Sequence, residues 1–131
     1  MNQIEKEIRE NIKKFRINDN ERNIAEAYIF FPSDFIGFKG HFPDNPILPG
    51  ICLVKALLVK LMIWKETSIR LKEMNSVKFF SPVQPGTILM FESSVVQEPD
   101  SDFCIVSSKV TCESRKIAQL KLKVKVNPTT L

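Results

Sequence analysis

Isoleucines recur every four positions among charged residues in the first part of the chain, at Ile4, Ile8 and Ile12. This spacing places them on one face of an amphipathic helix, because residues four apart lie one above the other on a helix surface. We therefore expect an N-terminal amphipathic helix over residues 1–17. The sequence Asn-Asp-Asn at 18–20 then predicts a turn.

A second helix is predicted over residues 46–65. From Ile51 to Trp64 the chain is apolar almost all the way round the helix, and only Lys55 and Lys60 interrupt it. A helix without a polar face has to be buried on most sides. The apolar stretch from Ile51 to Trp64 is shorter than the roughly twenty residues that cross a bilayer and contains two lysines, so we expect a central core helix and no membrane span.

The remaining apolar segments favour strands. Short segments rich in apolar and β-branched residues and bounded by turn residues predict strands at 23–31, 75–80, 87–97, 103–112 and, after residues 113–116, up to Val126. In the last of them Leu120, Leu122 and Val124 alternate with lysines, as in a half-buried strand with a solvated outer face. A four-strand meander after the central helix covers that helix only if the sheet curls around it, so we predict a single α+β domain over residues 1–131.

Composition narrows the function classes. The chain has 131 residues, 44% hydrophobic and 26% charged, which is typical of one soluble globular domain. No signal peptide opens the sequence, so we expect a cytoplasmic protein. The formal charge of +4 is spread along the chain without interleaved aromatic residues, which argues against nucleic-acid binding and suits an acidic protein partner.

Three scattered cysteines indicate reduced thiols and no metal site. Cys52 is either an activated thiol at a helix start or a small buried residue that fills space in the core.

Residues 32–50 contain four prolines, three glycines and the only histidine, His41. Prolines fix φ, so this loop would present the His41 imidazole on a stiff support. Gly50 lies where the central helix begins, and there backbone N–H groups lack intrahelical acceptors and the helix dipole is positive. A thioester carbonyl placed at Gly50 would be polarised, as the removal of an α proton requires.

The stretch from His41 to Gly50, HFPDNPILPG, resembles the signature of the hotdog-fold β-hydroxyacyl-carrier dehydratases, the group that contains FabZ and FabA. Pro82, Pro85 and Gly86 resemble the turn after the third strand of that family. The similarity covers roughly Phe31 to Val126. It implies a hotdog fold, a curled antiparallel sheet wrapped around one long apolar helix, here with an additional N-terminal helix.

The resemblance also implies an activity, the elimination of water from a 3-hydroxyacyl thioester in fatty acid or related lipid or polyketide biosynthesis, without a cofactor. The acyl chain would be carried by acyl carrier protein or coenzyme A. In the family a histidine of one subunit removes the α proton, and a glutamate or aspartate from the central helix of the other subunit helps to expel the hydroxyl group. These roles fall on His41 and, at the acidic position, Lys55. The expected substrate contacts are Gly50, Phe42, Pro49 and Ile51.

Lys55 leaves several interpretations open. A lysine of ordinary pKa, about 10.4, is a poor proton donor at neutral pH, although burial could lower that pKa. Alternatively Lys55 has no catalytic role and extends its ammonium to water. The chain is thus a dehydratase with an unusual site, a thioesterase of the same fold, or a non-catalytic or half-catalytic subunit that pairs with an acid-bearing paralogue. An open sheet edge and a half-built site predict at least a homodimer.

Overall fold

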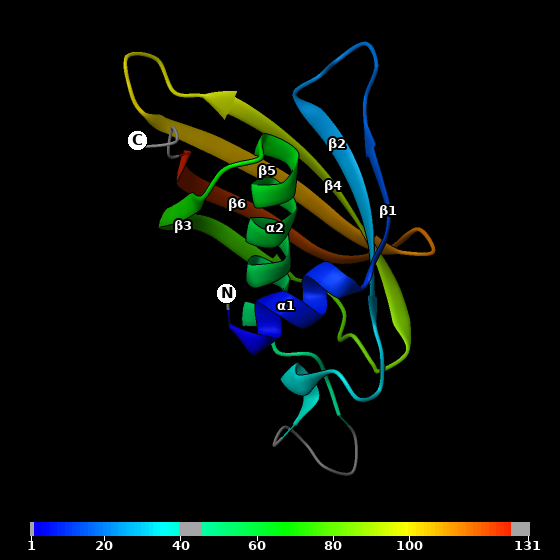
Figure 1. Cartoon of the computed structure of the whole chain (residues 1–131). Helices are drawn as coiled ribbons and strands as arrows, with labels where there is room; N and C mark the ends of the chain where they lie inside the picture. The colour runs from blue at the N-terminus through cyan, green and yellow to red at the C-terminus, as the bar shows by residue number, and fades with distance from the viewer. Residues whose placement is uncertain (1, 40–45, 127–131) are drawn as a thin grey trace.

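One antiparallel sheet curls around a central helix in the computed structural model, which describes residues 2–39 and 46–126 (Figure 1). The elements are α1 (Gln3–Glu10), β1 (Ile12–Ile17), β2 (Ile24–Phe31), the 3-10 helix η1 (Ile36–Phe38), α2 (Gly50–Lys65), β3 (Ile69–Phe79), β4 (Thr87–Gln97), β5 (Phe103–Cys112) and β6 (Arg115–Val126). The strands lie in the order β1-β2-β4-β5-β6-β3, so β1 and β3 form the two edges.

The core lies between α2 and the inner face of the sheet. Alternate residues of the strands point inward, as in β2, where Ala25, Ala27, Ile29 and Phe31 are all buried. Most of α2 is buried as well, which confirms the predicted core helix. No helix among the described residues has both the length and the apolar character that crossing a membrane requires. This is the α+β hotdog arrangement that the sequence resemblance implies.

The N-terminal helix is shorter than the predicted range of residues 1–17. It ends at Glu10 and is followed by the C-cap residue Asn11, whose side-chain Nδ2 donates to the carbonyl of Glu7 at 2.8 Å. Residues 12–17 form β1, which pairs antiparallel with β2. The four-residue spacing that ends at Ile12 fits a helix. However, Phe15 and Ile17 alternate like a strand, and pairing with β2 supplies backbone hydrogen bonds along one side of this edge segment.

The strand order also differs from the predicted meander. The meander is β4-β5-β6 alone, whereas β3 pairs with β6 at the far edge, and the proline-rich turn therefore does not join neighbouring strands. β3 begins at Ile69, six residues before the predicted start. Register irregularities follow Leu71 and Met74. They interrupt the period of two by which a half-buried strand is recognised in a sequence.

Lys60 connects α2 to the sheet from inside the core. Its ammonium group is fully buried and donates to the carbonyls of Ala25 and Phe91, both at 2.6 Å, and to Ser93 Oγ at 2.9 Å. Ser93 Oγ in turn donates to Ser108 Oγ at 2.9 Å. One side chain of α2 is therefore tied to β2 and β4 directly and to β5 through a serine.

Burial makes Lys60 a source of pH-dependent stability. It lowers the pKa of Lys60 from 10.5 to about 7, although the carboxylates of Glu26 and Glu92 favour the charged form. Between these two pH values the unfolded chain holds a proton that the folded chain has released. The free energy of unfolding should therefore rise with pH from about 7 towards 10, by at most about 1.4 kcal/mol per pH unit. Below pH 7 Lys60 adds no slope, because both states are protonated.

Urea unfolding of the wild type and of Lys60→Met, at several pH values on both sides of 7, tests this expectation. As pH rises above about 7, the free energy of unfolding of the wild type should increase relative to that of Lys60→Met. Lys55→Met, which alters a half-buried lysine of the same helix, is the matched control. A constant difference between wild type and Lys60→Met would show that Lys60 keeps its proton in the fold.

Candidate functional site

The start of α2 is set by two prolines. Residues 46–49 form neither helix nor strand, Pro49 is extended at φ −61° and ψ 141°, and the helix begins at Gly50 rather than at the predicted residue 46. A residue before proline disfavours the α conformation, so Leu48 cannot readily join the helix. The N–H of Leu48 instead donates to the carbonyl of Val83 at 2.8 Å. The end of the loop is thus fixed to the turn that follows β3.

The beginning of the loop is held from the other side. The N–H of Ile36, the first residue of η1, donates to Glu7 Oε1 of α1 at 3.0 Å. α1 in turn packs against α2 and crosses its lower part in Figure 1. The segment between η1 and α2, which carries the histidine of the signature, is therefore held at both of its described ends.

The first turn of α2 presents backbone N–H groups for which the described residues provide no acceptor. Pro49, the N-cap residue, provides no side-chain hydrogen bond, and no acidic side chain lies in the first turn. The N–H of Cys52 donates to the carbonyl of Pro49 at 2.9 Å, whereas the amides of Gly50 and Ile51 precede any intrahelical acceptor. The positive end of the helix is left without a side-chain anion from this turn, an arrangement that suits a ligand carbonyl or oxyanion.

A largely apolar cavity of about 280 Å³ adjoins these amides. Its lining residues are Ile47, Leu48, Gly50, Leu53, Phe79, Phe80, Ser81, Pro82 and Val83. The rings of Phe79 and Phe80 remain 53% and 48% exposed, which is unusual for phenylalanines beside a core. A Cβ atom on Gly50 would lie 2.4 Å from Cζ of Phe79, so the ring uses the space that glycine leaves.

The structure brings together some of the predicted site residues. Gly50 lines the cavity, whereas its chain neighbours Pro49 and Ile51 do not, and Ile51 is about half exposed. Phe35 and Phe38, which lie between β2 and the signature loop, belong to the buried core and do not line the cavity. His41 and Phe42 lie outside the described residues.

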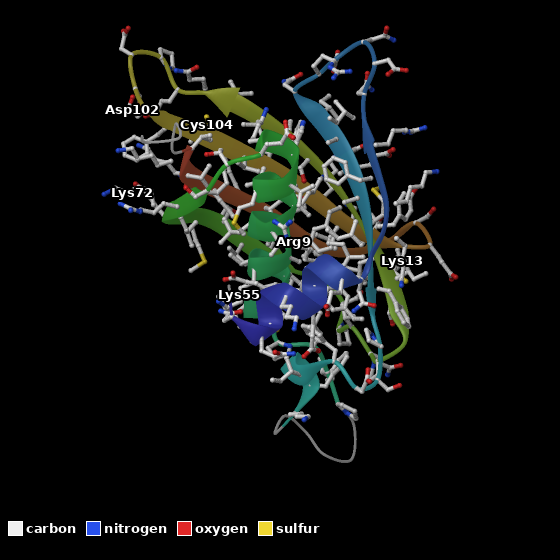
Figure 2. All side chains as sticks on the ribbon, in the orientation of Figure 1. Arg9, Lys13, Lys55, Lys72, Asp102 and Cys104 are labelled. Atoms are coloured by element: carbon white, nitrogen blue, oxygen red, sulfur yellow. The ribbon has the colours of Figure 1, made fainter. Side chains whose placement is uncertain are left out.

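Lys55 is half buried and does not line this cavity. Figure 2 shows it projecting from the lower part of α2, on the side away from β1 and β2. No ion pair joins Lys55 to another of the described residues. The described residues that line the cavity include neither a lysine nor a carboxylate.

Cys52 has the features of a buried filler rather than an activated thiol. Its side chain is 1% exposed, and burial raises the pKa of the thiol, an effect that the positive charge of Lys55 opposes. A thiol with a raised pKa stays protonated near neutral pH and is a poor nucleophile. In the described part of the chain no group of three histidine, cysteine, aspartate or glutamate side chains is placed to hold a metal ion.

Comparison with known proteins gives dehydratase relatives in sequence and solved structures that share the fold. A 3-hydroxyacyl-[acyl-carrier-protein] dehydratase FabZ of Ehrlichia canis is 29% identical over 113 residues, which cover 79% of this chain and 74% of the relative. The fold is shared with the dehydratase heterocomplex ApeI:P of Xenorhabdus doucetiae, with a TM-score of 0.68 and 18% identity over 87% of this chain and 96% of the other. It is also shared with Cj0977 of Campylobacter jejuni, a sigma28-regulated virulence protein, with a TM-score of 0.67 and 14% identity over 88% and 76% of the two chains.

The family assignment rests on the sequence. The ApeI-like family, described as ApeI dehydratase, matches residues 16–121, which is most of the chain and includes both the signature loop and the whole of α2. The FabZ relatives agree with this match. The chain therefore belongs to the ApeI-like dehydratase family, a FabZ-like group with the hotdog fold.

Proposed function

We propose that this chain binds a 3-hydroxyacyl thioester at the start of α2 and takes part in eliminating water from it to give a trans-2-enoyl thioester. The observation that carries the proposal is the combination of open amides at Gly50 with an apolar cavity of about 280 Å³ beside them. The carrier would be acyl carrier protein, as the names of the FabZ relatives suggest, or coenzyme A.

The chemistry divides into three tasks. The N–H of Gly50 donates to the thioester carbonyl oxygen and stabilises negative charge on it, which acidifies the α proton. The imidazole of His41, the base in the resemblance, takes that proton. The bond from the β carbon to the hydroxyl oxygen then breaks, and the hydroxyl leaves as water once it receives a proton. The double bond forms between the α and β carbons.

Protonation of the leaving hydroxyl group lacks an ordinary acidic donor in this chain. Lys55 stands at the family's acidic position, and the sequence contains no carboxylate between Pro46 and Lys65. A homodimer of this chain would therefore have two sites that can polarise and deprotonate the substrate but protonate the leaving group poorly. General acid catalysis is typically worth about 10²–10⁴-fold, which is the expected deficit of the homodimer.

A related subunit with a carboxylic acid on its central helix would remove this deficit. Paired with such a paralogue, the chain would contribute His41 and Gly50 to one complete site. A solved structure of similar fold is described as a dehydratase heterocomplex, which supports this arrangement. Thioester hydrolysis is the alternative outcome, and mass spectrometry separates it from elimination because it releases a free acid instead of an enoyl thioester.

His41 provides the first test. The purified protein, alone and with a coexpressed acid-bearing paralogue, is incubated with a 3-hydroxyacyl-carrier substrate, and loss of water is followed by mass spectrometry. His41→Ala should reduce dehydration by at least about a hundredfold, because the base is lost. Dehydration that is unchanged in His41→Ala would exclude the histidine from the mechanism.

Gly50 provides a test that does not depend on turnover. Gly50→Ala should displace the Phe79 ring into the cavity and weaken binding of a stable acyl-pantetheine analogue, measured by calorimetry. The melting temperature should change little, since Phe79 is half exposed and can move. The double variant Gly50→Ala with Phe79→Ala should recover part of the affinity. If Gly50→Ala binds the analogue as tightly as wild type, the acyl group is held elsewhere.

Lys55→Glu tests the missing acid. In the homodimer this substitution should raise the dehydration rate, by up to about 10²–10⁴-fold if the new carboxyl keeps its proton. Lys55→Gln, of similar size but unable to donate as an acid, is the matched control and should not raise it. A wild-type homodimer that is already fast, together with a slower Lys55→Glu variant, would show that the lysine itself is productive.

A further inference from the structure

A second cavity, of about 490 Å³, lies on the outer face of the sheet, which is turned away from α2. It crosses β4, β5, β6 and β3, and Asn18 and Ile24 border it at the end nearest the turn between β1 and β2. It is larger than the cavity at Gly50 and shares none of its described lining residues with it. Its volume is within the range of roughly 300–1,000 Å³ that is typical of small-molecule sites.

The floor of this outer cavity is held from inside the core. Ser93, Ser108 and Leu120 line the cavity although each is at most 3% exposed, so it is their backbone that forms the floor. The hydroxyl groups of the two serines belong to the hydrogen-bonded network of Lys60 on the other side of the sheet. The shape of the cavity therefore does not depend on a bound ligand.

Three lysines surround one end of the outer cavity. Lys109 of β5 and Lys78 of β3 are the partners of Gln119 on either side of β6, and Lys121 lies two residues further along β6. The register irregularities of these strand pairs fall outside these positions. Neighbouring strands are about 5 Å apart and alternate residues of a strand about 7 Å apart, so the three ammonium groups can converge above Gln119. We call these three lysines the lysine triangle.

The lysine triangle is not neutralised by the protein. All three side chains are exposed, and no ion pair joins any of them to a carboxylate among the described residues. Glu92, the only carboxylate among the described lining residues, lies opposite Lys109 on β4, at the edge of the triangle. The three positive charges repel one another around a neutral side chain, and a bound anion would turn this repulsion into attraction.

The other end of the outer cavity has a different chemistry. Ser94 of β4 pairs with Ser107 of β5, and Glu92 and Asn18 lie beside them. Hydroxyl and amide groups both donate and accept, and a carboxylate accepts, so this end suits the hydroxyl groups of a ligand. Glu92 would repel an anion placed here. No aromatic side chain is among the described lining residues, so a nucleobase would find nothing to stack on.

We propose that the outer cavity binds a small phosphate monoester that also carries hydroxyl groups, such as a sugar phosphate. The phosphate lies above Gln119, where its terminal oxygens accept from the lysine triangle in charge-assisted hydrogen bonds. A phosphate monoester carries roughly −1.5 to −2 charges near pH 7, which the three cations balance. The hydroxyl groups of the ligand extend towards Ser94 and Glu92. This site does not rest on the proposed function, because it lies on the opposite face of the sheet from α2.

Glucose 6-phosphate serves as the probe, and binding is measured by calorimetry at an ionic strength of about 0.1 M. Inorganic phosphate and glucose each provide half of the proposed ligand. Glucose 6-phosphate should bind at least about tenfold more tightly than inorganic phosphate, and glucose should not bind measurably, because the two ends of the cavity act together. Equal affinities for glucose 6-phosphate and inorganic phosphate would overturn the proposal. So would tighter binding of a hexaglutamate peptide, which would assign this face to an acidic protein instead.

A variant without the triangle tests the placement of the phosphate. It carries Lys78→Gln, Lys109→Gln and Lys121→Gln, and the matched control, which loses the same charge outside the cavity, carries Lys13→Gln, Lys72→Gln and Lys125→Gln. Lys125 is on the same strand as Lys121 but about 13 Å further along it, beyond the screening length of about 10 Å. The triangle variant should bind glucose 6-phosphate at least about tenfold more weakly than the control. An equal loss in both would show attraction by net charge alone and reject the site.

Nuclear magnetic resonance of the wild type provides a test that requires no variant to fold. Titration with glucose 6-phosphate should shift the backbone amide signals of residues 107–109 and 119–121, which lie around the triangle. Signals of the amides at the start of α2, on the other side of the sheet, should stay in place. Shifts confined to the start of α2, or no shifts at all, would contradict the proposal.

Discussion

A helix with no polar face must be covered on nearly every side, and the rest of this structure follows from that requirement. The sheet curls around α2, and α1 adds cover where the sheet does not reach. The only charged side chain of α2 that is fully buried, Lys60, is accommodated by three oxygen acceptors on β2 and β4. The start of the helix remains accessible, and it is there that open amides and an apolar cavity meet.

The sequence predicted those parts of the fold in which a local pattern and the tertiary environment agree. In β6 the alternation of leucine, valine and lysine gave the correct inner and outer faces, because one face packs on α2 and the other is solvated. The pattern failed at Ile12, whose spacing fits a helix although pairing with β2 decides the conformation. It also failed for the start of β3, where register irregularities interrupt the alternation.

The candidate site was predictable only to the extent that it lies on one continuous segment. Pro49 and Gly50 were identified from the signature, whereas Phe79 is almost thirty residues away in the sequence and its ring position over Gly50 depends on how β3 crosses the helix start. The network of Lys60, Ser93 and Ser108 was not predicted, since lysine and serine give no sign in a sequence of which acceptor they will meet. The composition of α2 indicated only that Lys60 interrupts an apolar helix.

The hydrogen bond from Leu48 to Val83 joins the two sequence signatures of the family resemblance, the loop that ends at Gly50 and the turn that contains Pro82. These segments are distant in the chain, but the hydrogen bond fixes the position of one relative to the other. A change of length in the turn would therefore be transmitted to the first amide of α2. In the evolution of related chains the two segments should be inherited together, and exchanging one of them alone between paralogues would misplace the helix start.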